Sequence, residues 1–514
     1  MKAKVLLISA VLILASLISI SQPAIQWQRS LGGSGIDDGN AIVQTSDGGY
    51  LVVGTSDWND GDVHGNHGQT DFWVVRLSAL GDTLWERSYG GSLFEEAYSV
   101  GETNDHGFIL AGFSSSSDGD VTVNHGQFDY WIVKLDSAGI LQWQRSFGGS
   151  GDDIAYCVKQ TFDGGYIVSG SSVSNDGDVT GNHGDDDYWI VKLNGSGDLI
   201  WQKSLGGSSY DIPGIISQTK DSGFIVNGFT FSNDGQVTGN HGNEDYWVVR
   251  LDKTGNLLWA ECLGGGGEDY GFTALELEDG GFIAGGYAAS SDGQVSGNHG
   301  LDDYWLVRLN DTGGIVWSTC LGGSDVENGC DVKITPTGEF IVAGISYSSD
   351  QQVTHSHGEG DYWIVRVGTT GNLIWEKALG GSSEDEAHSL ALTGDGGAIV
   401  AGYSLSNDGD VTGNHGDHDF WVVKLSSFTG IADAGHNDLL PVYPNPAKDQ
   451  IAIGASKTVS GIRLTDMNGL DIPVQARSQG DQTIINTSAL PAGVYLLSFN
   501  LDGTPVTRKI VIER

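Results

Sequence analysis

Residues 187–207 read DYWIVKLNGSGDLIWQKSLGG, a stretch that predicts two strands joined by a tight turn. Both flanking runs are rich in β-branched and aromatic residues, which favour strands. The Asn-Gly-Ser-Gly between them supplies glycines, Gly197 among them, that can adopt the positive φ angles of a short hairpin loop. The two runs should therefore pair as antiparallel neighbours in one sheet.

Copies of this stretch recur with a period of 58 residues, and two ladders of tryptophans keep the period without one insertion or deletion. One ladder comprises Trp27, Trp85, Trp143, Trp201, Trp259, Trp317 and Trp375. The other comprises Trp73, Trp131, Trp189, Trp247, Trp305, Trp363 and Trp421. Because both ladders lie in strand patterns, we expect these side chains to be buried, and Trp58 to be the one tryptophan in a loop.

Each period contains four strand-like runs, which in the third copy are 153–161, 166–172, 187–193 and 198–204. Four strands per copy and seven copies predict an all-β, seven-bladed β-propeller with 58-residue blades of four antiparallel strands. A linear β-solenoid is the structural alternative, although its coils are usually shorter. The chain begins with a fourth-strand pattern at 25–33, and the repeats end with a third-strand pattern at 419–425. We therefore expect the first strand to complete the last blade.

The repeat also resembles a known family. The run DYWVVRLDKTGNLLWAECLGG at 245–265, followed by an acidic pair and by GGFIAGGYAAS at 280–290, is similar to the bacterial SBBP-type β-propeller repeats of secreted proteins. The resemblance covers residues 25–425. It implies the fold and says little about activity, because one fold hosts many functions.

The charge of the chain excludes several classes of partner. Residues 22–436 contain 59 acidic and 16 basic side chains. Such a field repels nucleic acids and anionic lipid surfaces and favours solubility and cation binding. We therefore expect no nucleic-acid partner and no binding to a membrane surface.

The N-terminus predicts export. Residues 1–21 combine two lysines, an apolar run and small residues before Gln22, which is the pattern of a signal peptide; a membrane anchor is the alternative. We expect no transmembrane segment in the mature chain. Export permits disulfides, but the pairing of Cys157, Cys262, Cys320 and Cys330 does not follow from their spacing. The propeller should span 22–426.

A linker at 427–439 precedes a segment of different composition at 440–514, in which the 58-residue period stops and strand-like runs suggest a small β-sandwich. VYPNPAKDQIAI, LPAGVYLLSF and the terminal TRKIVIER resemble the type A C-terminal sorting domain of the type IX secretion system of Bacteroidota. The matching positions are Tyr443, Pro444, Asn445, Pro446, Gly493, Val494, Tyr495 and Lys509. The resemblance implies that the secretion machinery is a partner and that the mature protein is secreted, extracellular or held at the outer-membrane surface.

The longest loop of each copy contains the residue types of a metal site. In NDGDVTGNHGDDDYW, residues 175–189, carboxylates at the first, third and twelfth loop positions and a glycine at the sixth follow the oxygen spacing of an EF-hand. Three copies carry Gln at the third position, so calcium is predicted only in the four Asp-x-Asp copies. The candidate ligands are Asp60, Asp62, Asp71, Asp118, Asp120, Asp129, Asp176, Asp178, Asp187, Asp408, Asp410 and Asp419. The alternative is that these carboxylates accept backbone N–H bonds and close the loop. A residue that is present in every copy is usually required by the structure of the copy.

Two further repeated series lie on the same face as this loop. One histidine per copy, from His67 to His415, is a candidate metal ligand or a turn residue. One carboxylate per copy, from Asp37 to Asp385, begins the innermost strand and should ring the mouth of the central channel, where it either caps strand ends or holds a cation or polar ligand. The long loop and the crossover between blades should share one face of the ring.

Three functions remain open. An enzyme should break the sevenfold symmetry, and no nucleophile stands at a recognisable spacing from a base, so we expect no catalytic residues. A multivalent lectin would keep the symmetry and display aromatic residues in each groove. The sequence favours a non-catalytic binding, adhesion or scaffold module, with a surface glycan or another extracellular protein as candidate partner. A glycan-binding lectin and a polysaccharide- or peptide-degrading enzyme are the alternatives.

Overall fold

The computed structural model describes residues 22–428 without a gap in the backbone. In the C-terminal region it describes 442–443, 447–448, 450–454, 459–466, 471–479, 482–488, 490–491, 493–501 and 504–512. The signal-peptide prediction and most of the linker prediction therefore lie outside the described residues. One compact unit comprises Ala24–Ser427, and the C-terminal region from Phe428 belongs to another. None of the described segments is a helix that could cross a membrane.

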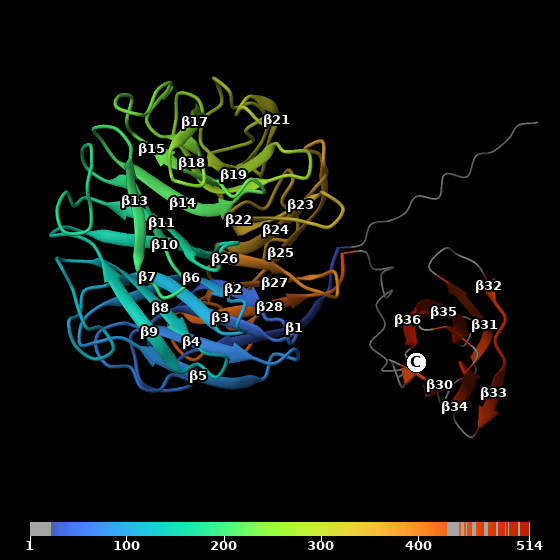
Figure 1. Ribbon diagram of the computed structural model, residues 1–514. Coiled ribbons are helices and arrows are strands. Elements are labelled where there is room, and N and C mark those ends of the chain that lie inside the picture. The colour runs from blue at the N-terminus through green and yellow to red at the C-terminus, as the bar shows by residue number, and fades with distance from the viewer. Residues whose placement is uncertain are drawn as a thin grey trace, which may run out of the picture. The chain divides into compact units, whose positions relative to one another are not determined.

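The first unit consists of groups of four antiparallel strands arranged in a ring (Figure 1), and one parallel pairing, between Ile215 and Thr273, joins two of these groups into one sheet. The innermost strands are β2 (Asp37–Gln44), β6 (Glu95–Glu102), β10 (Asp153–Gln160), β14 (Asp211–Gln218), β18 (Asp269–Glu276), β22 (Glu327–Ile334) and β26 (Asp385–Leu392). The second strands are β3 (Tyr50–Ser56), β7 (Phe108–Ser114), β11 (Tyr166–Ser172), β15 (Phe224–Thr230), β19 (Phe282–Ala288), β23 (Phe340–Ser346) and β27 (Ala398–Ser404).

The third strands carry the second tryptophan ladder, and the fourth strands carry the first. The third strands are β4 (Asp71–Leu77), β8 (Asp129–Leu135), β12 (Asp187–Leu193), β16 (Asp245–Leu251), β20 (Asp303–Leu309), β24 (Asp361–Val367) and β28 (Asp419–Leu425). The fourth are β5 (Thr83–Tyr89), β9 (Leu141–Phe147), β13 (Leu199–Leu205), β17 (Leu257–Leu263), β21 (Ile315–Leu321), β25 (Leu373–Leu379) and β1 (Ile25–Leu31). The expected all-β propeller class is confirmed.

The ring closes by pairing of distant segments. Strand β1 is antiparallel to β28, with Ser30 opposite Trp421, so the first strand completes the sheet of β26, β27 and β28 as expected. Backbone bonds continue the pairing, since Ser426 N donates to Ala24 O at 2.9 Å. This closure removes the open edge that β28 would otherwise present to another chain.

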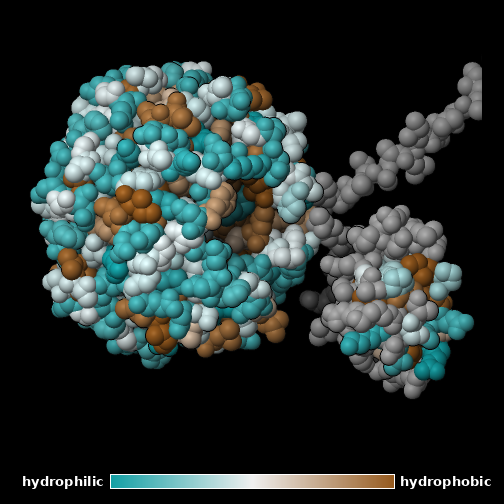
Figure 2. All heavy atoms as spheres, in the orientation of Figure 1, coloured by the Kyte–Doolittle hydropathy of each residue, from teal (hydrophilic) through white to brown (hydrophobic). Residues whose placement is uncertain are grey.

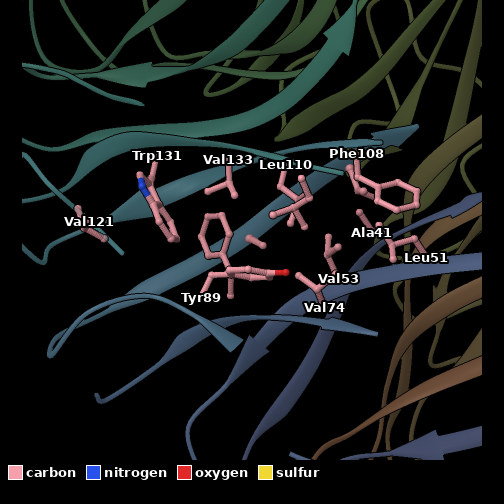
Figure 3. Packing of buried hydrophobic residues seen from close by; sticks show 14 residues of the cluster. Ala41, Leu51, Val53, Val74, Tyr89, Phe108, Leu110, Val121, Trp131 and Val133 are labelled. Atoms are coloured by element: carbon pink, nitrogen blue, oxygen red, sulfur yellow. The ribbon is translucent and has the colours of Figure 1, made fainter. Parts of the chain in front are cut away.

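The hydrophobic core lies between adjacent blades. Figure 3 shows one such cluster, in which Val53 and Val74 of the first blade face Leu110, Trp131 and Val133 of the second. The tryptophan is fully buried, as in the other third strands. Its ring centroid lies 4.5 Å from that of a phenylalanine in the neighbouring blade. Repeating this contact around the ring supplies most of the buried apolar surface, which is the main stabilising term for such a fold.

The fourth-strand tryptophans are mostly only half-buried, so the expectation of burial was correct for one ladder and wrong for most of the other. The fourth strand is the outermost of each blade, and one of its faces therefore meets solvent. The ring of Trp143, for example, covers Gly197 of the next blade, whose φ is +81° and whose added Cβ would lie 2.8 Å from the indole. Only glycine fits this turn without strain.

The described part of the C-terminal region forms two four-stranded sheets. One comprises β29 (Val442–Tyr443), β30 (Gln450–Gly454), β34 (Gln482–Asn486) and β33 (Ala476–Gln479). The other comprises β32 (Asp471–Ile472), β31 (Val459–Asp466), β35 (Gly493–Leu501) and β36 (Thr504–Ile512). Apolar residues of both sheets, including Ile451 and Leu497, share one buried cluster, as in the expected sandwich.

Candidate functional site: the loop face and the axial cavity

The first carboxylate of the repeated loop binds the crossover between blades. Asp60 Oδ1 accepts a hydrogen bond from Ser34 N at 2.8 Å, and Asp60 Oδ2 accepts one from Ser34 Oγ. The equivalent backbone bond occurs in all seven copies, at 2.7–2.9 Å. The loop and the crossover therefore share one face, as the strand order requires, and the carboxylate joins them.

The third loop position also contacts a crossover glycine, and a carboxylate is not needed there. Asp120 and Asp178 accept bonds from Gly90 N and Gly148 N at 3.4 Å. In the copies that carry glutamine, Gln236 Oε1 accepts the corresponding bond at 3.2 Å. Because an amide and a carboxylate oxygen make the same contact, this position requires an acceptor rather than a charge.

The twelfth loop position begins the third strand and is buried. Asp71 Oδ2 accepts bonds from His67 N at 3.0 Å and contacts His67 Nδ1 at 2.6 Å. The same histidine–aspartate contact measures 2.5–2.7 Å in five further copies, and is 3.5 Å at His357. The repeated histidines thus orient the loop through this carboxylate.

The other oxygen of this aspartate faces a second buried carboxylate. Asp71 Oδ1 has no hydrogen-bond partner among the described residues, and the six equivalent oxygens are likewise unpaired. A Cβ added to Gly90 would lie 2.6 Å from Asp71 Oδ1 and 2.7 Å from Glu95 Oε2, so both acids converge on one glycine. The seven pairs are Asp71 with Glu95, Asp129 with Asp153, Asp187 with Asp211, Asp245 with Asp269, Asp303 with Glu327, Asp361 with Asp385, and Asp419 with Asp37.

Burial raises the pKa of the aspartate that begins each third strand. The pKa of Asp71 is raised from 3.8 to about 6, chiefly by desolvation, with a further contribution from the charge of Glu95. Desolvation likewise raises the pKa of Asp211 to about 6. The unpaired oxygen and the adjacent acid make the ionised form of each pair unfavourable.

The expectation that the acids from Asp37 to Asp385 ring the channel mouth was wrong. They begin the innermost strands but are fully buried, and each accepts a hydrogen bond from a crossover glycine N at 2.6–2.8 Å. They therefore cap backbone N–H groups. The next residue of each strand, such as Asp38 or Glu96, is half-exposed, because neighbouring side chains of a strand point to opposite sides.

The three carboxylates predicted to hold calcium have separate partners in each loop. The first and third positions contact the crossover, whereas the twelfth is buried against the histidine and the adjacent acid. Within the described residues, no group of three or more His, Cys, Asp or Glu side chains has the geometry of a metal site. Calcium in the four Asp-x-Asp copies stays a prediction.

The innermost strands enclose a cavity of about 460 Å³ on the axis of the ring. Figure 2 shows a hollow near the centre of the ring, with apolar side chains at its rim. All seven innermost strands contribute to the lining. Apolar residues such as Val100, Ile215 and Phe272 form most of the wall, and Tyr98, Tyr156 and Lys159 add polar groups.

The cavity wall varies from copy to copy, although the rest of the repeat is almost constant. The third strands read DFWVVRL, DYWIVKL, DYWIVKL, DYWVVRL, DYWLVRL, DYWIVRV and DFWVVKL. By contrast, the fourth residue of the innermost strand is Asn40, Tyr98, Tyr156, Gly214, Phe272, Cys330 and His388. The seventh is Val43, Gly101, Lys159, Ser217, Leu275, Lys333 and Ala391, and of these Val43, Lys159, Lys333 and Ala391 line the cavity. The scaffold therefore does not dictate these positions, and the axial cavity is asymmetric.

A cluster of acids, histidines and tyrosines lies on one side of the loop face. His418 Nδ1 is 2.8 Å from Asp38 Oδ1, and Tyr403 stacks on His418 with ring centroids 4.3 Å apart. Tyr403 Oη donates to Glu384 at 2.6 Å. The hydrogen bond to Asp38 raises the pKa of His418 above its ordinary value, and burial opposes this. Glu386 similarly raises the pKa of His388 against the effect of burial.

The sequence predicted a central channel, but the residues that line the cavity were not among the predicted site residues. The signal that could have identified them is the set of positions at which the copies differ within otherwise regular strands.

Of the four cysteines, Cys157, Cys262 and Cys320 are buried and free.

The residues of the sorting motif are described in part. Pro444, Asn445 and Pro446 lie outside the described residues, as do the side chains of Tyr443, Val494 and Lys509. Tyr495 is 6% exposed in the C-terminal core, and its hydroxyl donates to Pro491 O at 2.9 Å. At Tyr495 the motif therefore contributes to the stability of the sandwich.

Residues 441–513 match the family model described as the secretion system C-terminal sorting domain. This domain indicates a secreted protein that is attached to the cell surface, and it implies contact with the secretion machinery. No curated protein matches the chain.

Several solved structures resemble the chain remotely. Sqt1 from Chaetomium thermophilum is 12% identical with a TM-score of 0.39, covering 79% of this chain and 100% of that one. The complex of BBS1N with ARL6DN is 12% identical with a TM-score of 0.42, and the match covers 79% of this chain and 98% of that one. Puromycin hydrolase is 14% identical with a TM-score of 0.44, and the match covers 87% of this chain and 58% of that one. These resemblances carry no functional argument.

Proposed function

We propose that the propeller is a non-catalytic binding module, displayed outside the cell, that takes a small ligand into its axial cavity. The observation that carries the proposal is the contrast between an almost constant scaffold and a cavity wall that differs in every blade. A cavity of about 460 Å³ with an apolar wall and a few polar groups has the size and character of small-molecule sites. We further propose that export uses the type IX machinery, as in Bacteroidota, and that the blades belong to the SBBP-type repeats.

The contacts of the polar groups around the cavity favour recognition over catalysis. Asp331 Oδ2 accepts a bond from Leu390 N at 3.0 Å, and its Oδ1 contacts Lys333 Nζ. His388 Nδ1 lies 3.1 Å from Asn40 Oδ1. Groups that the scaffold already holds in fixed pairs suit orientation of a ligand better than proton transfer to it.

A cavity-filling substitution tests the proposal. The full chain is screened by thermal shift against soluble metabolites and oligosaccharides, together with Ala391→Trp, which fills the cavity, and Ala138→Trp, which adds the same side chain to an exposed turn. We expect compounds that raise the melting temperature of the wild type and of Ala138→Trp, but not of Ala391→Trp. Near-ultraviolet circular dichroism checks that the variants are folded. If Ala391→Trp is not folded, Val43→Phe is used in its place.

Other results distinguish the alternatives. Equal shifts in both variants, or no compound that binds, would contradict the axial site. Binding of several oligosaccharide molecules per ring, with the same affinity in Ala391→Trp as in the wild type, would favour a lectin. Chemical conversion of a bound compound, detected by mass spectrometry, would favour an enzyme.

A further inference from the structure

The axial cavity carries positive charge within a strongly acidic ring. Residues 22–436 contain 59 acidic and only 16 basic side chains, yet Lys159 and Lys333 both line the cavity. They come from β10 and β22, on different blades, at the same strand position. Desolvation lowers the pKa of Lys333, Asp331 opposes this effect, and the positive charge of Lys159 lowers the pKa further.

The cavity lining supplies too little negative charge to balance the two lysines. Among the described lining residues, Asp331 is the one with a carboxylate side chain. Its two oxygens already accept hydrogen bonds, one from Lys333 Nζ and one from Leu390 N. No hydrogen bond or ion pair joins the Lys159 ammonium to another of the residues that the structure describes. One of the two cations is therefore left without a partner at the cavity wall.

Much of the cavity wall offers the two lysines no hydrogen-bond acceptor. The wall contains Ile42, Ile212, Phe229 and Leu390, which cannot accept a hydrogen bond through their side chains. A cation beside such a surface loses part of its hydration, and an ion pair with good geometry restores the loss. An anionic group placed between the two lysines would be bound by charge-assisted hydrogen bonds from both.

We propose that the axial cavity binds a small molecule that joins an apolar body to a carboxylate, with the carboxylate held by Lys159 and Lys333. This inference rests on the proposed function, because it names the chemical class for the same cavity. The apolar body lies against the residues of β14 and β18. The cavity volume is that of an ordinary small-molecule site, which suits a medium-chain carboxylate rather than a polymer.

Three probes of matched length test the charge class. The full chain is titrated calorimetrically at neutral pH with octanoate, octan-1-ol and octylamine, which differ only at the head group. We expect octanoate to bind at least about tenfold more tightly than the other two, since a charge-assisted hydrogen bond is worth that ratio or more. Lys159→Met should lower the octanoate affinity by about tenfold and leave octan-1-ol unchanged.

Two controls separate charge from folding. Lys253→Met makes the same change in an exposed turn, and we expect no effect on octanoate binding. Lys159→Arg keeps the charge and should retain the preference for octanoate. If Lys159→Met does not fold, Lys159→Gln provides the same comparison.

The failure of this inference differs from the failure of the proposed function. Octan-1-ol or octylamine binding as tightly as octanoate, in a manner sensitive to Ala391→Trp, would overturn the carboxylate class and leave the axial site in place. Absence of binding by all three probes would also overturn the class, while the wider compound screen decides the site itself.

Discussion

Replacement of one buried aspartate by asparagine should stabilise the propeller at neutral pH. In Asp71→Asn, the amide oxygen can keep the bonds from His67, and the amide N–H₂ takes the place of the unpaired Oδ1 beside Glu95. The change removes a buried charge and adds a donor where two acceptors now face each other. Both effects favour the folded state.

The size of the effect follows from the pKa of Asp71, which is raised from 3.8 to about 6. A shift of one pKa unit corresponds to about 1.4 kcal/mol, so ionising this fully buried group costs up to about 3 kcal/mol at pH 7. Because the group is coupled to Glu95, we expect a gain of about 1–3 kcal/mol in the free energy of unfolding at pH 7.

The sign of the pH dependence is the reverse of ordinary acid denaturation. A carboxyl group whose pKa is raised in the folded state binds more protons there than in the unfolded state. Its contribution to stability is complete below pH 3.8 and is lost as the pH rises through about 6. The wild type should therefore gain stability between pH 7 and about pH 4.5, and Asp71→Asn should gain less over the same interval.

Urea unfolding at pH 7, 6, 5 and 4.5 measures this difference. Asp187→Asn changes the equivalent pair in the third blade and should behave like Asp71→Asn. Asp311→Asn makes the same chemical change at an exposed turn and should have no effect at any of these four pH values. A variant that is less stable than the wild type at pH 7, or a difference that does not depend on pH, would refute the account of the buried pairs.

Three other predictions concern the loops, the closure and the tail. If the Asp-x-Asp loops hold calcium, calcium should raise the melting temperature relative to a chelator, and Asp178→Asn should reduce this rise; an unchanged melting temperature would reject calcium. Leu31→Asp places a charge in the buried closure of β1 on β28 and should cost at least about 3 kcal/mol in urea unfolding, whereas Gln26→Asp on the exposed side should cost little. Leu497→Asp disrupts the core of the C-terminal sandwich and should abolish surface display in cell fractionation, with Gln475→Asp as the exposed control; normal display of Leu497→Asp would contradict a folded sorting domain.

The strands could be predicted because each copy repeats the same local signals. The expected runs 187–193 and 198–204 correspond to β12 (Asp187–Leu193) and β13 (Leu199–Leu205), since the glycine turn between them leaves little freedom in register. Closure by β1 was also predictable, because the order of strand patterns at the two ends of the repeats leaves one edge to be filled.

The cavity wall could not be predicted with the same ease. A β-bulge interrupts each innermost strand, between Ala155 and Cys157 in the third blade. The extra residue breaks the alternation of side chains, so that consecutive residues after the bulge, such as Ser389, Leu390 and Ala391, all line the cavity. Pairing of Asp71 with Glu95 joins two blades through a shared glycine, a contact that no local pattern signals.

The closing bond between Ala24 and Ser426 has a consequence for how the ring is held. Both ends of the propeller leave it at the same blade, so anything attached beyond Ser427 pulls on one point of the rim. A force that separates these two ends would open the antiparallel β1–β28 ladder from the pair Ile25 and Leu425, one bond after another. In the other blades all four strands come from one continuous stretch of the chain, so the closing blade is the one whose integrity depends on the two ends staying together.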